Sequence, residues 1–158
     1  MIGALLLACS LGSEPLATGE WARDYLPSDG RYSEYAWASS PTDSPMMLLV
    51  DGDQWQLRNG ATWNTSTELG PFTVDASDGL WLDDTLLLPD QVTLGVEQDG
   101  MSVTHRGSAE VYYGTFSATA TVEVADGDFA GEHTLAVGHG PIVFTWQGVR
   151  WELVYYEE

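Results

Sequence analysis

The sequence feature that most constrains the fold is the alternation of apolar and polar residues over Phe116–Val124. Apolar side chains at every second position are typical of a β-strand that buries one face. The run ends at Asp126-Gly127, a pair that favours a two-residue type I′ turn. With that turn Val124 faces Phe129, and most later pairs also join two apolar residues. Residues 116–137 therefore predict an antiparallel β-hairpin.

Similar turn signals recur along the rest of the chain. Asp, Asn or Gln before Gly separates short apolar runs, which is the pattern of successive tight hairpins. One of them would pair an apolar with a polar residue, so an irregular or bulged hairpin is expected there. The turns and the pairs they predict are Asp51-Gly52 (Leu48 with Trp55), Asn59-Gly60 (Leu57 with Thr62), Asp99-Gly100 (Val96 with Val103) and Gln147-Gly148 (Phe144 with Trp151).

The spacing of these turns predicts an all-β fold. Short strands at regular intervals form either a closed barrel or a sandwich, and a meander of tight hairpins favours the barrel. We expect residues 19–158 to form a single domain, an antiparallel and closed or nearly closed β-barrel, with a β-sandwich as the alternative. Residues 21–26 fit a first strand or a short helical turn equally well, and no other segment of this domain has a helical pattern.

The charge of the chain excludes several classes of partner. There are 24 acidic residues, five arginines and no lysine, which gives a formal net charge of −19. A field of that sign repels nucleic acid and anionic lipid headgroups, but it tolerates cations and basic partners. The charge is explained either as a solubilising shell or as a field for a specific cationic ligand.

The first eight residues are apolar, and Cys9 ends that run. Leu6-Leu7-Ala8-Cys9 resembles the lipobox of bacterial lipoproteins, a family in which the cysteine sulfur carries diacylglycerol. The resemblance implies that residues 1–8 are a signal peptide, that Cys9 is the lipid attachment site and that residues 9–18 are a tether. It also implies a bacterial cell-envelope location, with Ser10 favouring the outer membrane. The alternative is a hydrophobic N-terminal peptide with an incidental cysteine.

The segment Gly19-Glu20-Trp21 resembles the Gly-x-Trp start of lipocalins and related calycins. In those barrels the tryptophan plugs one end, and an arginine of the last strand packs over it. The resemblance implies these roles for Trp21 and Arg150, and it implies an interior cavity for a small apolar ligand.

No catalytic or metal-binding motif occurs in the sequence. The histidines His105, His133 and His139 are interpreted as structural, and the Asp-Gly-Asp segments as turns rather than calcium loops. Glu110 and Glu132 lie among aromatic residues, and they are the only candidates we note for a pair of hydrolytic carboxylates. No cofactor is expected.

The aromatic residues are the best candidates for ligand contact. Neighbouring tyrosines such as Tyr112 and Tyr113 point to opposite faces of a strand, so some rings face outward or into a cavity. Exposed rings stack on sugars and bind apolar ligands, whereas the alternative is that they fill the core. The candidate ligand-binding residues are Trp81, Tyr112, Tyr113 and Tyr155.

Three functional hypotheses follow from the sequence. The first is a lipid-anchored envelope protein whose barrel binds a small molecule or a protein partner without catalysis. The second is a carbohydrate-binding β module that uses outward aromatic rings. The third is a small hydrolase with buried carboxylates.

Overall fold

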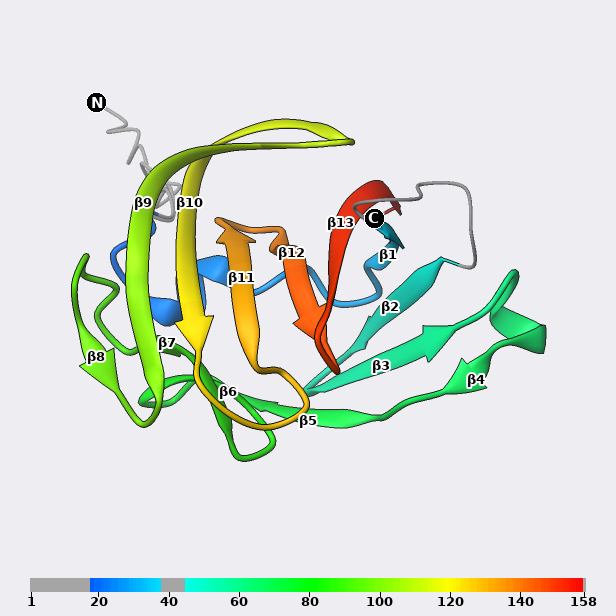
Figure 1. Ribbon diagram of the computed structural model, residues 1–158. Helices are drawn as coiled ribbons and strands as arrows, with labels where there is room; N and C mark the ends of the chain where they lie inside the picture. Colours follow the sequence, from blue (N-terminus) through cyan, green and yellow to red (C-terminus); the bar gives the residue numbers. More distant parts are fainter. Residues whose placement is uncertain (1–17, 38–44, 158) are drawn as a thin grey trace, which may run out of the picture.

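The computed structural model describes residues 18–37 and 45–157, and these residues form an all-β domain (Figure 1). The predicted signal peptide and Cys9 lie outside the described residues. Residues 22–25 form a short 3₁₀ helix, η1 (Ala22–Tyr25), which settles the ambiguity at residues 21–26. The strands and a second 3₁₀ turn are β1 (Tyr32–Trp37), β2 (Met46–Asp51), β3 (Gln54–Asn59), η2 (Trp63–Thr65), β4 (Thr67–Glu68), β5 (Phe72–Asp75), β6 (Gly79–Leu82), β7 (Thr85–Pro89), β8 (Glu97–Gln98), β9 (Met101–Val111), β10 (Gly114–Val124), β11 (Gly131–Ala136), β12 (Gly140–Trp146) and β13 (Val149–Glu157).

The strands form one antiparallel sheet that curls into a nearly closed barrel (Figure 1). Its order is β7-β6-β5-β3-β2-β1-β13-β12-β11-β10-β9-β8, with β4 attached to the side of β3. Most neighbours in the sheet are also neighbours in sequence, as a meander of hairpins requires. The pairing between the strands most distant in sequence is that of β1 with β13, which lie side by side. The predicted fold class is therefore confirmed.

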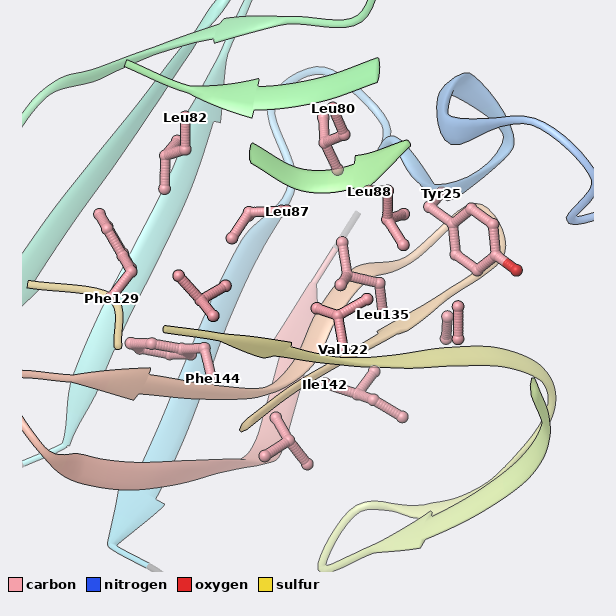
Figure 2. Close-up of a cluster of buried hydrophobic side chains, with 14 of the residues drawn as sticks. Tyr25, Leu80, Leu82, Leu87, Leu88, Val122, Phe129, Leu135, Ile142 and Phe144 are labelled. Carbon is pink, nitrogen blue, oxygen red and sulfur yellow. The ribbon is translucent and has the colours of Figure 1, made fainter. Parts of the chain in front are cut away.

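Side chains fill the interior of the barrel. Figure 2 shows Leu80, Leu82, Leu87 and Leu88, from β6 and β7, in one cluster with Val122, Leu135 and Ile142 from the opposite strands. Leu80, Leu88 and Leu135 have no exposed surface at all. The β6–β7 hairpin thus supplies apolar side chains against which β10, β11 and β12 bury their own apolar faces.

Two of the predicted hairpins have the predicted register. Gln147 and Gly148 both have positive φ, at 48° and 77°, and Phe144 pairs with Trp151. Asp99 and Gly100 have almost the same angles, 48° and 77°, and Glu97 pairs with Ser102 across that turn. Both turns therefore have the two left-handed residues of a type I′ loop, whose twist matches that of the strands it joins.

The hairpin at Asp126-Gly127 differs from its prediction. Val124 pairs with Gly131 and not with Phe129, because residues 125–130 form a wider loop in which only Gly127 has positive φ. Within the loop Ala130 N donates to Gly127 O, and the loop backbone also bonds to neighbouring turns: Ala125 N donates to Gly100 O, and Gln147 N donates to Asp128 O. The register moves by two residues, which keeps Ala120, Val122 and Val124 on the buried face as predicted. Ala118 was predicted to be buried with them, but it is exposed and Thr119 is buried instead, because the register shifts between Phe116 and Thr119.

The turn at Asp51-Gly52 also differs from prediction, whereas the connection after Asn59-Gly60 is irregular, as expected. At Asp51-Gly52 the loop is one residue later, so Val50 pairs with Trp55 and Asp51 with Gln54. Leu48 therefore faces Leu57, and both remain buried. The turn after Asn59 is not a tight hairpin, because residues 60–66 include η2 before β4 rejoins β3.

Candidate functional site

The apolar cavity inside the described barrel is too small for a ligand. A small apolar cavity of about 20 Å³ lies between β3, β7 and β11, lined by residues that include Leu57, Leu87 and His133. A cavity needs roughly 10–15 Å³ of this kind of volume to hold one water molecule. The space is therefore large enough for about one water, not for a lipid or a sugar.

Among the described residues that line this cavity, His133 is the one with an ionisable side chain. Its Nε2 is 2.6 Å from the carbonyl oxygen of Phe129, and only 1% of the residue is exposed. Burial lowers the pKa of His133, because the apolar surroundings disfavour the imidazolium. Its position on the apolar side of β11 agrees with the structural role predicted for it.

Three of the four candidate binding residues lie on the outer surface. Tyr112 and Tyr113 form the turn between β9 and β10, and they are 54% and 45% exposed. Tyr155, near the end of β13, is 45% exposed. The hydroxyl of Tyr156 raises the pKa of Tyr113, and Tyr155 adds a smaller effect in the same direction. The end of β13 and the tip of the β9–β10 hairpin therefore lie in one region.

The distal half of the β9–β10 hairpin forms an arm, residues 107–118, which crosses one end of the barrel toward β13 (Figure 1). A bulge between Phe116 and Thr119 marks the bend. At the far end, Tyr113 N donates to Leu153 O over 3.1 Å. The tip of the hairpin therefore reaches across the end of the barrel and contacts β13.

An aromatic cluster of Tyr113, Phe116, His139 and Tyr156 holds the arm in place. The ring centroids of Tyr113 and Tyr156 are 4.7 Å apart, and those of Phe116 and His139 are 5.0 Å apart. The guanidinium of Arg31, which is 1% exposed, lies 3.8 Å from the Tyr156 ring. This distance is typical of a cation–π contact, which is stronger where the cation is shielded from water.

Carboxylates surround the exposed tyrosines. Tyr155 Oη donates to Glu157 Oε2 over 3.3 Å, and the charge of Glu157 raises the pKa of Tyr155. Glu34 pairs with Tyr155 across β1 and β13, and Glu110 lies on the arm two residues before Tyr112. We call this surface the tyrosine face; it consists of Tyr112, Tyr113, Tyr155, Glu34, Glu110 and Glu157.

The fourth candidate, Trp81, lies elsewhere. It is on β6, at the opposite end of the barrel from the arm (Figure 1). Its Nε1 donates to Asp78 Oδ1 over 3.1 Å, and its ring packs partly against the core. The structure does not bring Trp81 together with the three tyrosines.

Glu110 and Glu132 are not arranged as a pair of hydrolytic carboxylates. Glu110 pairs with Thr115 near the tip of the arm, whereas Glu132 pairs with Glu123 at the far end of β10. Arg150 Nε binds Glu132 at 3.3 Å. Within residues 18–37 and 45–157 no three His, Cys, Asp or Glu side chains are grouped to hold a metal ion. None of the helices in this part of the chain is long and apolar enough to cross a bilayer.

The chain enters the barrel beside the base of the arm. Gly19 O accepts hydrogen bonds from Tyr25 Oη at 3.0 Å and from Arg106 Nη2 at 2.7 Å. Trp21, in contrast, is 37% exposed, with the guanidinium of Arg23 5.5 Å from its ring. Sequence reasoning missed Arg106 and assigned Arg150 to this region, although Arg150 binds Glu132 and Glu152.

Comparison with known proteins gives no match: no family model, no curated protein and no solved structure matches this chain. A function has therefore to be inferred from the residues of the chain itself. The filled interior, the tyrosine face and the entry point of the chain are the features from which we infer it.

Proposed function

We propose that this protein is a non-catalytic binding domain, held at a bacterial cell envelope by a lipid on Cys9, that binds its partner with its outer surface. The observation that carries the binding part is the filled interior. Pockets for small molecules usually measure about 300–1,000 Å³, whereas the cavity here measures about 20 Å³. Ligand carriage inside the barrel is thus disfavoured, and surface contact is the mode that remains.

The tyrosine face is the surface best suited to this role. Its rings are about half exposed, which is unusual for large side chains that have an apolar body. Tyrosine gains binding energy through its ring and specificity through its hydroxyl, so it is enriched where proteins meet partners. The arm that carries Tyr112 and Tyr113 also lies beside the start of the described chain, because Arg106, just before the arm, binds the carbonyl oxygen of Gly19.

The anchor is tested by metabolic labelling with radioactive palmitate in a bacterium that processes lipoproteins. The wild-type chain is expected to incorporate label and to fractionate with membranes, while Cys9→Ser loses both because it has no sulfur to acylate. Ser13→Ala leaves Leu6-Leu7-Ala8-Cys9 intact and is the matched control. Equal labelling of wild type and Cys9→Ser would contradict the anchor.

A second candidate function, binding of carbohydrate, is favoured by exposed rings that lie beside carboxylates. Sugars present apolar C–H faces to rings and hydroxyls to carboxylates. Binding on a glycan array that is lost in Tyr112→Ala/Tyr155→Ala, and kept in Trp81→Ala, would support this function.

A further inference from the structure

The arginines of this chain leave most of its negative charge without a partner of opposite sign. All five lie in the described part of the chain. Arg106 binds the carbonyl oxygens of Gly19 and Val92, and Arg150 binds Glu132 and Glu152. Arg58 binds Glu68 at 3.6 Å. With 24 acidic residues against these five cations, a positively charged partner is attracted from a distance.

Aromatic rings repeatedly receive guanidinium groups in this fold. Arg31 lies 3.8 Å from the Tyr156 ring, Arg58 5.2 Å from Trp63 and Arg23 5.5 Å from Trp21. Three of the five arginines therefore make this contact. One of the three lies within the aromatic cluster that supports the tyrosine face.

The tyrosine face offers the same chemistry to an outside group. Its rings are exposed, and Glu34 and Glu157 supply carboxylates beside Tyr155. A carboxylate that accepts one tyrosine hydrogen bond keeps lone pairs for a guanidinium, which binds carboxylates through two parallel N–H groups. Ring and carboxylate together recognise arginine better than either does alone.

We infer that the tyrosine face binds a basic, arginine-containing polypeptide segment. This inference rests on the proposed function, because it names the partner of the surface-binding domain. The other end of the barrel provides the internal comparison: the turns at residues 97–100 and 123–128 carry exposed carboxylates, but no exposed aromatic ring is recorded among them. That acidic end attracts any cation, whereas the tyrosine face adds contacts that depend on the rings.

The test is an isothermal calorimetric titration of the full chain with an oligo-arginine peptide at physiological ionic strength. The chain carries Cys9→Ser, so that the result does not depend on lipidation. Tyr112→Leu/Tyr155→Leu keeps apolar side chains but removes the aromatic faces, and it is expected to weaken binding about tenfold, because two exposed cation–π contacts contribute about 0.5–1 kcal/mol each. Thermal melting verifies that each variant remains folded.

Two further variants separate specific binding from general attraction. Glu34→Gln/Glu157→Gln removes two charges from the tyrosine face and is expected to weaken binding. Asp126→Asn/Asp128→Asn removes two charges from the acidic end, beyond the range of strong electrostatic interaction at this salt concentration, and is expected to change affinity less than twofold. A glutamine peptide of equal length is expected not to bind.

Three outcomes would overturn the inference. In the first, the two charge-removing variants weaken peptide binding equally. In the second, the tyrosine variant binds the peptide with unchanged affinity, and in the third the chain binds neutral glycans but not the peptide. The last outcome would replace the basic peptide with a carbohydrate and leave surface binding intact. Palmitate labelling depends on Cys9 alone, so the anchor and the partner can fail independently.

Discussion

The core of the barrel and the β9–β10 arm are held by different kinds of contact. The core joins side chains from β6, β7, β10, β11 and β12, many of them without exposed surface (Figure 2). The arm is held at its tip by one backbone hydrogen bond to Leu153 and by the rings of the aromatic cluster. Val111 is the arm residue that belongs to the buried cluster. Because the core buries many more side chains, we expect core substitutions to lower the free energy of unfolding more than arm substitutions do.

The largest expected effect is in the core. Leu135→Ala removes three carbon atoms from a residue with no exposed surface and enlarges the cavity beside His133. The expected loss in the free energy of unfolding is about 2–5 kcal/mol, measured by urea denaturation. Leu94→Ala, at a residue that is 60% exposed, is the control and is expected to stay within about 0.5 kcal/mol of wild type. Similar losses in the two variants would contradict the assignment of stability to the core.

A change in pH is expected to alter the stability of the folded chain by an intermediate amount. The unfolded chain binds a proton at residue 133 more tightly than the folded chain does, because burial lowers the pKa of His133. The stabilising contribution is therefore complete above the unfolded pKa of about 6.5, and it is lost as pH falls below that value toward the folded pKa. Melting temperature is expected to decrease between about pH 7.5 and about pH 5, where histidine is the side chain that ordinarily titrates.

The matched variants separate His133 from the other histidines. His133→Gln cannot titrate, so its melting temperature is expected to vary less over this pH range. His105→Gln changes an exposed residue and is expected to keep the wild-type dependence. A wild-type slope in His133→Gln would show that another group is responsible.

The smallest effect on stability is expected in the arm. Phe116→Ala removes a ring that contacts His139 and Tyr113, and it is expected to lower the free energy of unfolding by about 1 kcal/mol. Hydrogen exchange is expected to accelerate strongly at the Tyr113 amide, which bonds to Leu153, but little at Val122 in the core. Thr115→Ala, at an exposed position on the same arm, is the control. Uniform acceleration throughout the chain would mean that core and arm open together.

The sequence predicted the faces of the strands better than it predicted their partners. Alternation predicted the buried Ala120, Val122 and Val124, and a register shift of two residues does not change their face. It did not predict the bulge before Thr119, where the alternation breaks. Asp99-Gly100 and Gln147-Gly148 closed as type I′ turns, whereas Asp126-Gly127 did not. The difference lies in neighbouring turns, since the loop at 125–130 bonds to Gly100 and Gln147, which are distant in sequence.

The candidate site was predicted in part for the same reason. Tyr112 and Tyr113 were predicted to point to opposite faces of a strand, but they form the turn between β9 and β10, and both rings are exposed. The supporting contacts of Arg31 with Tyr156 and of Arg106 with Gly19 join residues far apart in sequence. The composition, with many aromatic residues, only five arginines and no lysine, could have suggested that an arginine packs against an aromatic ring.

The contact between Arg106 and Gly19 has a mechanical consequence. Arg106 lies in the middle of β9, and its side chain binds the first turn of the described chain through the carbonyl oxygen of Gly19. If Cys9 carries lipid, tension between the membrane and the domain reaches the longest antiparallel pair at its centre, not at a loose strand end. The force needed to unfold the domain would then be determined by the backbone hydrogen bonds between β9 and β10.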